Sequence, residues 1–175
     1  MVYFSEGSNE SVIDKNQISV LLDKLLLQMG KTSRVLILPP DLTRFDSYAG
    51  EITRMLYYKL KGHSHVEIMP ALGTHLPLTD KELEIMYDGI PHNLFRIHNW
   101  RDDVVRLGTI PPDITAELTN DLVDFPIDCE INKLLVEGNW DQIISVGQVV
   151  PHELAGMANY NKNIFVGERG KVGKR

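Results

Sequence analysis

The sequence contains a single cysteine, Cys129, among its 175 residues. One thiol can form neither an intramolecular disulfide nor a thiolate cluster for a metal, and such usage favours a reducing compartment. The chain also lacks an apolar run long enough to span a bilayer, and its start lacks the basic and apolar segments of a secretory signal peptide. These absences predict a cytoplasmic protein with no membrane partner.

An excess of positive charge is missing as well. The chain has 18 lysines and arginines against 24 acidic residues, a net charge of −6, so it carries no basic footprint for nucleic acid. Its hydrophobic content of 43% and charged content of 24% are ordinary for a globular protein. The length is sufficient for one domain with a substantial core, so we expect a single α/β domain over residues 1–175.

Several common sequence motifs are absent. The chain has no Gly-x-Ser-x-Gly nucleophile elbow, no Gly-x-Gly-x-x-Gly dinucleotide fingerprint and no Cys/His cluster with zinc-finger spacing. The stretch from His152-Glu153 begins like the zinc motif His-Glu-x-x-His, but Gly156 replaces the second histidine. The basic tail, Gly167–Arg175, does not meet the spacing of a phosphate-binding loop. None of these motifs therefore identifies a function.

What is present is an alternation of helical and strand patterns. Apolar spacing and helix-start residues predict helices at 17–29, 48–60 and 79–87, strands at 34–38, 65–72, 95–99, 103–107 and 141–150, and a loop at 109–119. Residues 129–136 fit either a strand or a strand followed by a helix. The alternation favours parallel pairing with right-handed crossovers, so we predict an α/β fold with a mainly parallel sheet and helices on both faces.

Polar side chains follow three of the predicted strands. Asp41-Leu-Thr-Arg44 follows the first, Gly73-Thr-His75 follows the second, and His152 follows the last, with Lys162 ten residues further on. If the three strands are neighbours, these loops open onto one edge of the sheet and converge on one cleft. Two histidines suit two-base chemistry, and an arginine can bind a carboxylate through two hydrogen bonds. The lysine offers an amine that can be cationic, nucleophilic or covalently modified.

Each of these residues also has a plainer interpretation. Asp41 and Arg44 could form an ion pair that fixes the loop, His75 could bond to the backbone, and Lys162 could be a solvated surface lysine. On the residues alone, two other functions stay open. One is an organic-acid or nucleotide-binding domain without catalysis, in which binding survives substitution of both histidines. The other is a metal-dependent hydrolase with His75 and His152 as ligands, which would lose its metal in His75→Ala.

The ordered set of strand-end motifs resembles the N-terminal catalytic domain of the nickel-dependent lactate racemase family, over roughly residues 35–167. The motifs are Asp41-Leu-Thr-Arg44, Ala71-Leu-Gly-Thr-His75 and Val150-Pro-His152 followed by Lys162. The resemblance implies a nickel-pincer nucleotide cofactor tethered to Lys162 through a thioamide. It implies that His75 and His152 alternate as acid and base, that Asp41 and Thr43 line the cofactor, and that Arg44 binds the substrate. The reaction implied is racemisation or epimerisation of a 2-hydroxy acid, with hydride transfer to the cofactor.

The chain departs from this family at three places. The family has Gly-Phe-Ser-Gly-Gly ahead of the lysine, where this chain has Gly156-Met-Ala-Asn-Tyr-Asn161, and it has a proline where this chain has Phe45-Asp46. The loss of glycines changes how closely the backbone can approach a ligand. The family's nickel-ligating histidine and its C-terminal domain lie beyond Arg175. The resemblance therefore implies the N-terminal part of a two-domain enzyme, inactive and without bound nickel on its own, with an exposed face that could pair two copies as a homodimer.

Overall fold

The computed structural model describes residues 2–152, 156–168 and 170. Glu153 and most of the basic tail thus lie outside the described residues. The α-helices are α1 (Lys15–Met29), α2 (Ala49–Leu60), α3 (Asp80–Tyr87), α4 (Pro112–Thr119) and α5 (Lys133–Glu137). The strands are β1 (Arg34–Leu38), β2 (His65–Ile68), β3 (Val104–Ile110), β4 (Ile127–Asn132), β5 (Gln142–Ser145), β6 (Pro151–His152) and β7 (Gly156–Met157). Shorter helical turns are η1 (Leu42–Ser47), η2 (His92–Leu94) and the π-helical η3 (Asn163–Gly167).

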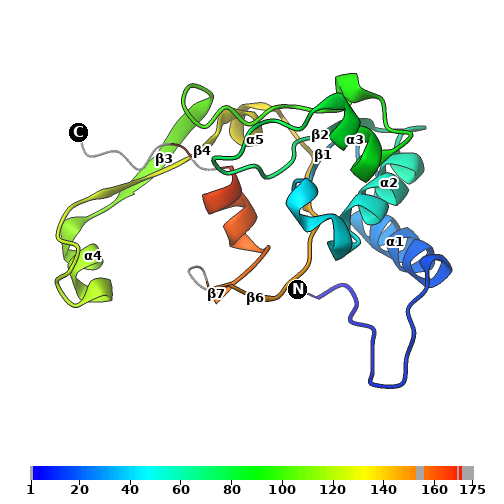
Figure 1. The fold of residues 1–175 in the computed structure, drawn as a ribbon, viewed down its shortest axis with the longest axis horizontal. Helices are drawn as coiled ribbons and strands as arrows, with labels where there is room; N and C mark the ends of the chain where they lie inside the picture. Colours follow the sequence, from blue (N-terminus) through cyan, green and yellow to red (C-terminus); the bar gives the residue numbers. More distant parts are fainter. Residues whose placement is uncertain (1, 153–155, 169, 171–175) are drawn as a thin grey trace.

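Three strands form a parallel sheet in the order β2-β1-β5 (Figure 1). Ile37 of the central strand lies opposite Ile68 of β2 and Ile144 of β5, which fixes the register. Parallel neighbours must be joined by crossovers, and the intervening helices supply them. The prediction of neighbouring parallel strands is confirmed, so the carboxyl ends of β1, β2 and β5 meet at one edge.

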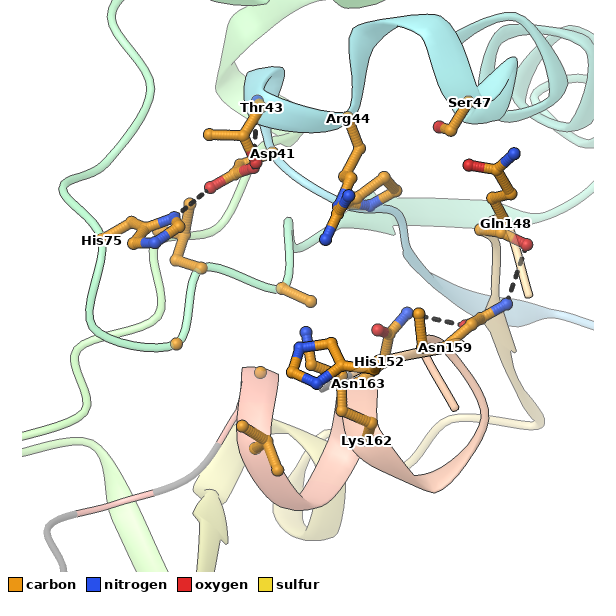
Figure 2. Close-up of a pocket in the computed structure, with 18 of the residues that line it drawn as sticks. Asp41, Thr43, Arg44, Ser47, His75, Gln148, His152, Asn159, Lys162 and Asn163 are labelled. Atoms are coloured by element: carbon orange, nitrogen blue, oxygen red, sulfur yellow. Dashed lines mark hydrogen bonds and ion pairs between the residues drawn. The ribbon is translucent and has the colours of Figure 1, made fainter. Parts of the chain in front are cut away.

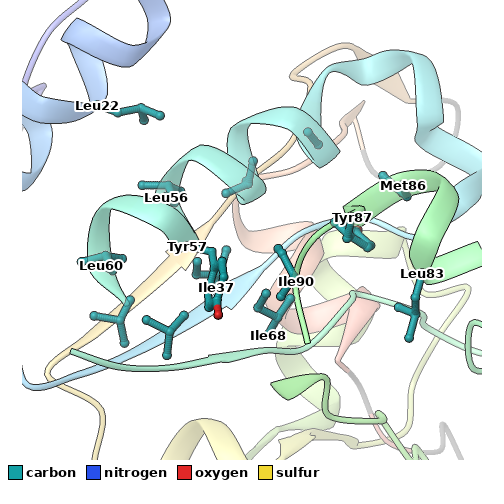
Figure 3. Close-up of a cluster of buried hydrophobic side chains, with 14 residues drawn as sticks. Leu22, Ile37, Leu56, Tyr57, Leu60, Ile68, Leu83, Met86, Tyr87 and Ile90 are labelled. Carbon is teal, nitrogen blue, oxygen red and sulfur yellow. The ribbon is translucent and has the colours of Figure 1, made fainter. Parts of the chain in front are cut away.

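The main hydrophobic core lies between the sheet and helices α1, α2 and α3 (Figure 3). Because side chains alternate along a strand, Val35 and Ile37 of β1 face this core, while Leu36 and Leu38 face the other side. The core contains these buried side chains from the three helices: Leu22, Leu56, Tyr57, Leu60, Leu83, Met86 and Tyr87. Partly buried residues of α5 and η3 cover the opposite face. The predicted placement of helices on both faces is confirmed.

Two capping boxes set the starts of α1 and α3. The side chain of Asp14 accepts a hydrogen bond from the backbone of Gln17, whose own side chain accepts one from the backbone of Asp14. Thr79 and Glu82 form the same reciprocal pair ahead of α3. The described helices do not combine the length and apolar character that crossing a membrane requires.

Two predicted strands are shorter in the structure than in the prediction. β2 ends at Ile68 instead of residue 72, and β5 ends at Ser145 instead of residue 150. Beyond Ile68 the chain still pairs with β1 through Met69 N to the Ile37 carbonyl and Ala71 N to the Pro39 carbonyl. Pro39 has no N–H to donate in return, so the ladder becomes one-sided and the strand stops.

Two other sequence predictions were wrong. The predicted strand at 95–99 is only an isolated bridge between Phe95 and Ile68. The predicted loop at 109–119 contains the end of β3 and helix α4. Pro112 occupies the first turn of α4, where its missing N–H costs nothing, so a proline here is compatible with a helix.

β3 and β4 form an antiparallel ribbon that extends away from the parallel sheet and carries α4 at its far end (Figure 1). A register shift between Arg106 and Gly108 bends the ribbon. β4 leads directly into α5, so the ambiguous stretch 129–136 is a strand followed by a helix. The ribbon's inner end places Asn132 beside the segment that follows η3.

Glu67 of β2 is buried and charged. Arg96 Nε donates a hydrogen bond to Glu67 Oε2 over 2.6 Å, and His65 Nε2 lies 2.8 Å from Oε1. The hydrogen bond from Arg96 has the largest effect on the pKa of Glu67. Together with the hydrogen bond to His65, it outweighs burial, which would raise this pKa. The pKa of Glu67 is therefore lowered from 4.5 to about 2.

We expect Glu67→Gln to lower the free energy of unfolding by about 2 kcal/mol near neutral pH. This value is smaller than the free energy equivalent to the whole pKa shift of Glu67, because Arg96 is partly exposed and solvent screens the ion pair. A depressed folded-state pKa means that this stabilisation is complete above pH 4.5 and is lost as the pH falls toward 2. Urea unfolding of both proteins at about pH 6 and about pH 3 measures the difference. An equal difference at the two pH values would contradict this assignment.

Candidate functional site

A cavity of about 460 Å³ opens at the edge where β1, β2 and β5 end (Figure 2). Its volume lies in the range of about 300–1,000 Å³ that small-molecule sites occupy. All six residues singled out from the sequence line it: Asp41, Thr43, Arg44, His75, His152 and Lys162. The predicted convergence of the strand ends on one cleft is thus confirmed.

Asp41 is fixed at the end of β1 by the turn that follows it. Its side chain accepts hydrogen bonds from the backbone N–H of Thr43, over 3.1 Å, and from the Thr43 hydroxyl. These bonds start η1 and hold Thr43 and the exposed Arg44 on the rim of the cavity. The plainer interpretation, an ion pair between Asp41 and Arg44, is wrong for this carboxylate, which binds His75 instead.

His75 Nδ1 lies 2.5 Å from Asp41 Oδ2. A neutral imidazole that donates to a carboxylate carries its proton on Nδ1, which leaves Nε2 as the nitrogen that can accept a proton. Burial would raise the pKa of Asp41, but the hydrogen bonds from His75 and Thr43 outweigh it and keep this pKa below its usual value. Asp41 thus stays ionised and orients the ring of His75.

His152 lies on a short antiparallel pair at the opposite side of the cavity. Its strand β6 pairs with β7, with His152 opposite Gly156, and Ala158 N donates to the Val150 carbonyl over 2.8 Å. Gly156 has a φ of +74°, a conformation that residues with a Cβ rarely adopt. The half-buried imidazole therefore sits on a paired segment of backbone between the end of β5 and Lys162.

Lys162 is half-buried immediately before η3. Its backbone N–H donates to the Asn159 carbonyl over 3.0 Å. Within the part of the chain that the structure describes, no carboxylate forms an ion pair with its amine. π-helical turns such as η3 are rare in proteins, and those that occur are often at functional sites. The amine is therefore placed in the cavity wall without a competing anion.

The far end of η3 is attached to the loop that carries His75. Gly73 N donates to the Gly167 carbonyl over 2.7 Å, and a Cβ on residue 167 would come within 2.8 Å of the Cβ of Ala71. Glu168, the next residue, is fully buried: its Oε2 lies 3.1 Å from His98 Nδ1, and its carbonyl accepts from Asn132 N. η3 therefore bridges the ends of β5 and β2 across the base of the cavity.

Sequence reasoning missed three polar residues that surround the start of η3. The Ser145 hydroxyl donates to Asn159 Oδ1 over 2.8 Å, and Asn163 Nδ2 lies 3.0 Å from Ser145 Oγ and 2.8 Å from Asn159 Oδ1. Asn159 Nδ2 donates to the Gly147 carbonyl over 2.9 Å. The available signal was the asparagine itself, which lies in the stretch where this chain lacks glycines of the family motif described above.

The family model described as the lactate racemase N-terminal domain matches residues 9–171. The chain belongs to this family. A search of curated proteins found no match. The resemblance drawn from the strand-end motifs is thereby confirmed.

Two solved structures are similar to this chain. A crystal structure of a Thermotoga maritima protein has a TM-score of 0.82 and 26% identity, covering 91% of this chain and 39% of that one. The lactate racemase apoprotein from Thermoanaerobacterium thermosaccharolyticum has a TM-score of 0.60 and 22% identity, covering 82% of this chain and 32% of that one. At that identity the second likeness shows a shared fold. This chain therefore spans well under half the length of either structure.

Proposed function

We propose that this chain carries the acid–base histidines and the cofactor-bearing lysine of a lactate-racemase-like enzyme, which racemises or epimerises a 2-hydroxy acid. The main support is the convergence of the six predicted residues, which come from three separate strand ends, on one cavity. Family membership supports the isomerase class. The cavity supports a small substrate, since its volume suits a small molecule with several polar contacts.

The residues of the cavity fit the organic part of a nickel-pincer nucleotide. The amine of Lys162 offers the attachment point, and Asp41 and Thr43 line the opposite wall. When bound, this group supplies an acceptor for the hydride on the substrate's Cα. Within residues 2–152, 156–168 and 170, no group of three or more His, Cys, Asp or Glu residues could hold a metal ion.

Arg44 would bind the substrate, and the two histidines would transfer protons. The exposed guanidinium of Arg44 on the rim can bind the substrate carboxylate through two parallel hydrogen bonds. His75, oriented by Asp41, accepts the hydroxyl proton at Nε2 as the Cα–H bond breaks and a keto acid forms. His152 would donate a proton to the carbonyl oxygen of the keto acid during its reduction on the opposite face. For the other enantiomer, the two histidines exchange roles.

The test is the conversion of single enantiomers by the complete gene product, produced together with the cofactor-building enzymes. We expect a pure 2-hydroxy acid to become a mixture of enantiomers or epimers. Chiral chromatography measures this conversion over time. Deuterium placed at Cα should stay in the product, because the hydride moves to the cofactor and back and does not exchange with water. A loaded protein that leaves all tested acids unchanged, yet still binds them after both histidines are substituted, would overturn the proposal in favour of a binding domain.

A further inference from the structure

We propose that Asn159 is a positioning residue that holds Lys162 in the cavity by fastening its turn to the end of β5. The inference rests on the proposed function, because it concerns how the lysine is presented for acylation. Figure 2 shows Asn159 and Asn163 on the same side of the cavity as Lys162, with the dashed bonds that connect the two amides to each other and to the strand end.

The backbone of this turn is unfavourable on its own. Asn159 and Tyr160 have φ values of +60° and +47°, so two successive residues with side chains adopt the left-handed conformation. This conformation costs about 1–2 kcal/mol per residue with a Cβ, with asparagine among the best tolerated. The turn therefore needs compensating interactions to persist.

The side chain of Asn159 supplies those interactions. Its Oδ1 accepts from Ser145 in β5 and from Asn163 in η3, and its Nδ2 donates to the Gly147 carbonyl just past β5. Asn163 is buried and Asn159 is half-buried, so these bonds are partly shielded from water. One amide thus joins the sheet edge to both ends of the turn that contains Lys162.

The same residue also determines the backbone position of the lysine. The Asn159 carbonyl accepts the hydrogen bond from Lys162 N, so a displacement of Asn159 displaces the start of η3. The far end of η3 stays attached through Gly167 to Gly73. Loss of the amide should therefore free the lysine's turn locally and leave the rest of the domain folded.

The test compares the acetylation of single lysines in the complete gene product without cofactor. Limiting acetic anhydride is added, and peptide mass spectrometry gives the labelling of Lys162 and Lys59 relative to the exposed Lys31. In Asn159→Gly, which can adopt the same φ without strain, we expect the Lys162 ratio to rise by at least about threefold as the amine reaches solvent. Ser145→Ala, which removes the hydrogen bonds that the Ser145 hydroxyl makes with Asn159 and with Asn163, should change the ratio in the same direction.

Two controls separate positioning from general loosening. Tyr160→Gly removes the backbone strain of the second residue in the left-handed conformation. The exposed ring of Tyr160 takes no part in the amide network, so this variant should keep the wild-type Lys162 labelling ratio. Lys59, whose side chain is 21% exposed and paired with Asp23 in a distant part of the domain, should label equally in all variants. An unchanged Lys162 ratio in Asn159→Gly, or an equal rise at Lys59, would overturn the positioning role. The labelling needs neither cofactor nor substrate, so a failure of the labelling prediction would leave the proposed racemisation or epimerisation untouched. Conversely, the expected labelling in a protein that does not convert any 2-hydroxy acid would overturn only the proposed reaction.

Discussion

His75→Gln and His152→Gln are each expected to lower kcat by about 10²–10⁴-fold in the complete, cofactor-loaded protein. Glutamine can still donate and accept hydrogen bonds, but it cannot carry a proton at neutral pH. Since each histidine acts as a base in one direction and as an acid in the other, either substitution should slow both directions. A substitution cannot change the equilibrium between the two enantiomers, so kcat/KM must fall by the same factor in the two directions.

Initial rates measured from each enantiomer provide the data for this prediction. His92→Gln is the matched control, because His92 bonds to the exposed Asp80 and does not line the cavity. The control should keep the wild-type rate. If either His75→Gln or His152→Gln turned over substrate at the wild-type rate, that histidine would have no acid–base role.

Lys162→Arg is expected to abolish turnover. Arginine keeps the positive charge and much of the length of the side chain, but its guanidinium is not a nucleophile that can form the thioamide link. An effect of charge alone would therefore survive this substitution, whereas covalent attachment would not. Since no described carboxylate pairs with Lys162, the substitution should leave the fold intact.

Turnover and retained nucleotide are measured on the same preparations after denaturation and washing. Lys133→Arg is the control, because Lys133 pairs with Asp103 outside the cavity. It should retain both the nucleotide and the activity of the wild type. Wild-type turnover in Lys162→Arg would show that the lysine is not an attachment site.

Much of the parallel sheet could be predicted from local sequence. The apolar run at 34–38 is stopped by two prolines, and the capping box at Thr79 marks α3, so short-range chemistry suffices there. The strand ends were less predictable. Whether β2 continues past Ile68 depends on whether its neighbour can donate hydrogen bonds, and that neighbour offers Pro39. α4 was missed because a proline in a first helical turn has the same sequence appearance as one in a loop.

That these residues line one cavity could be predicted, whereas the hydrogen bonds among them could not. Parallel strand order brings Asp41, His75 and His152 to one edge, so the set followed from topology. The spacing of Asp41 and Arg44 suggested a local ion pair, but the carboxylate binds His75, 34 residues away. Only three-dimensional placement of two loops decides between such partners. The amide network around Asn159 is likewise built from residues of two elements that no local pattern connects.

The most direct test of the account is to locate the cofactor on the chain. The complete gene product is produced with the cofactor-building enzymes, its intact mass is measured, and its peptides are sequenced by tandem mass spectrometry. We predict a mass increase that maps to Lys162 and is absent from Lys162→Ala. An adduct on another residue, or no adduct when the cofactor is demonstrably available, would contradict the assignment of this cavity as the cofactor site.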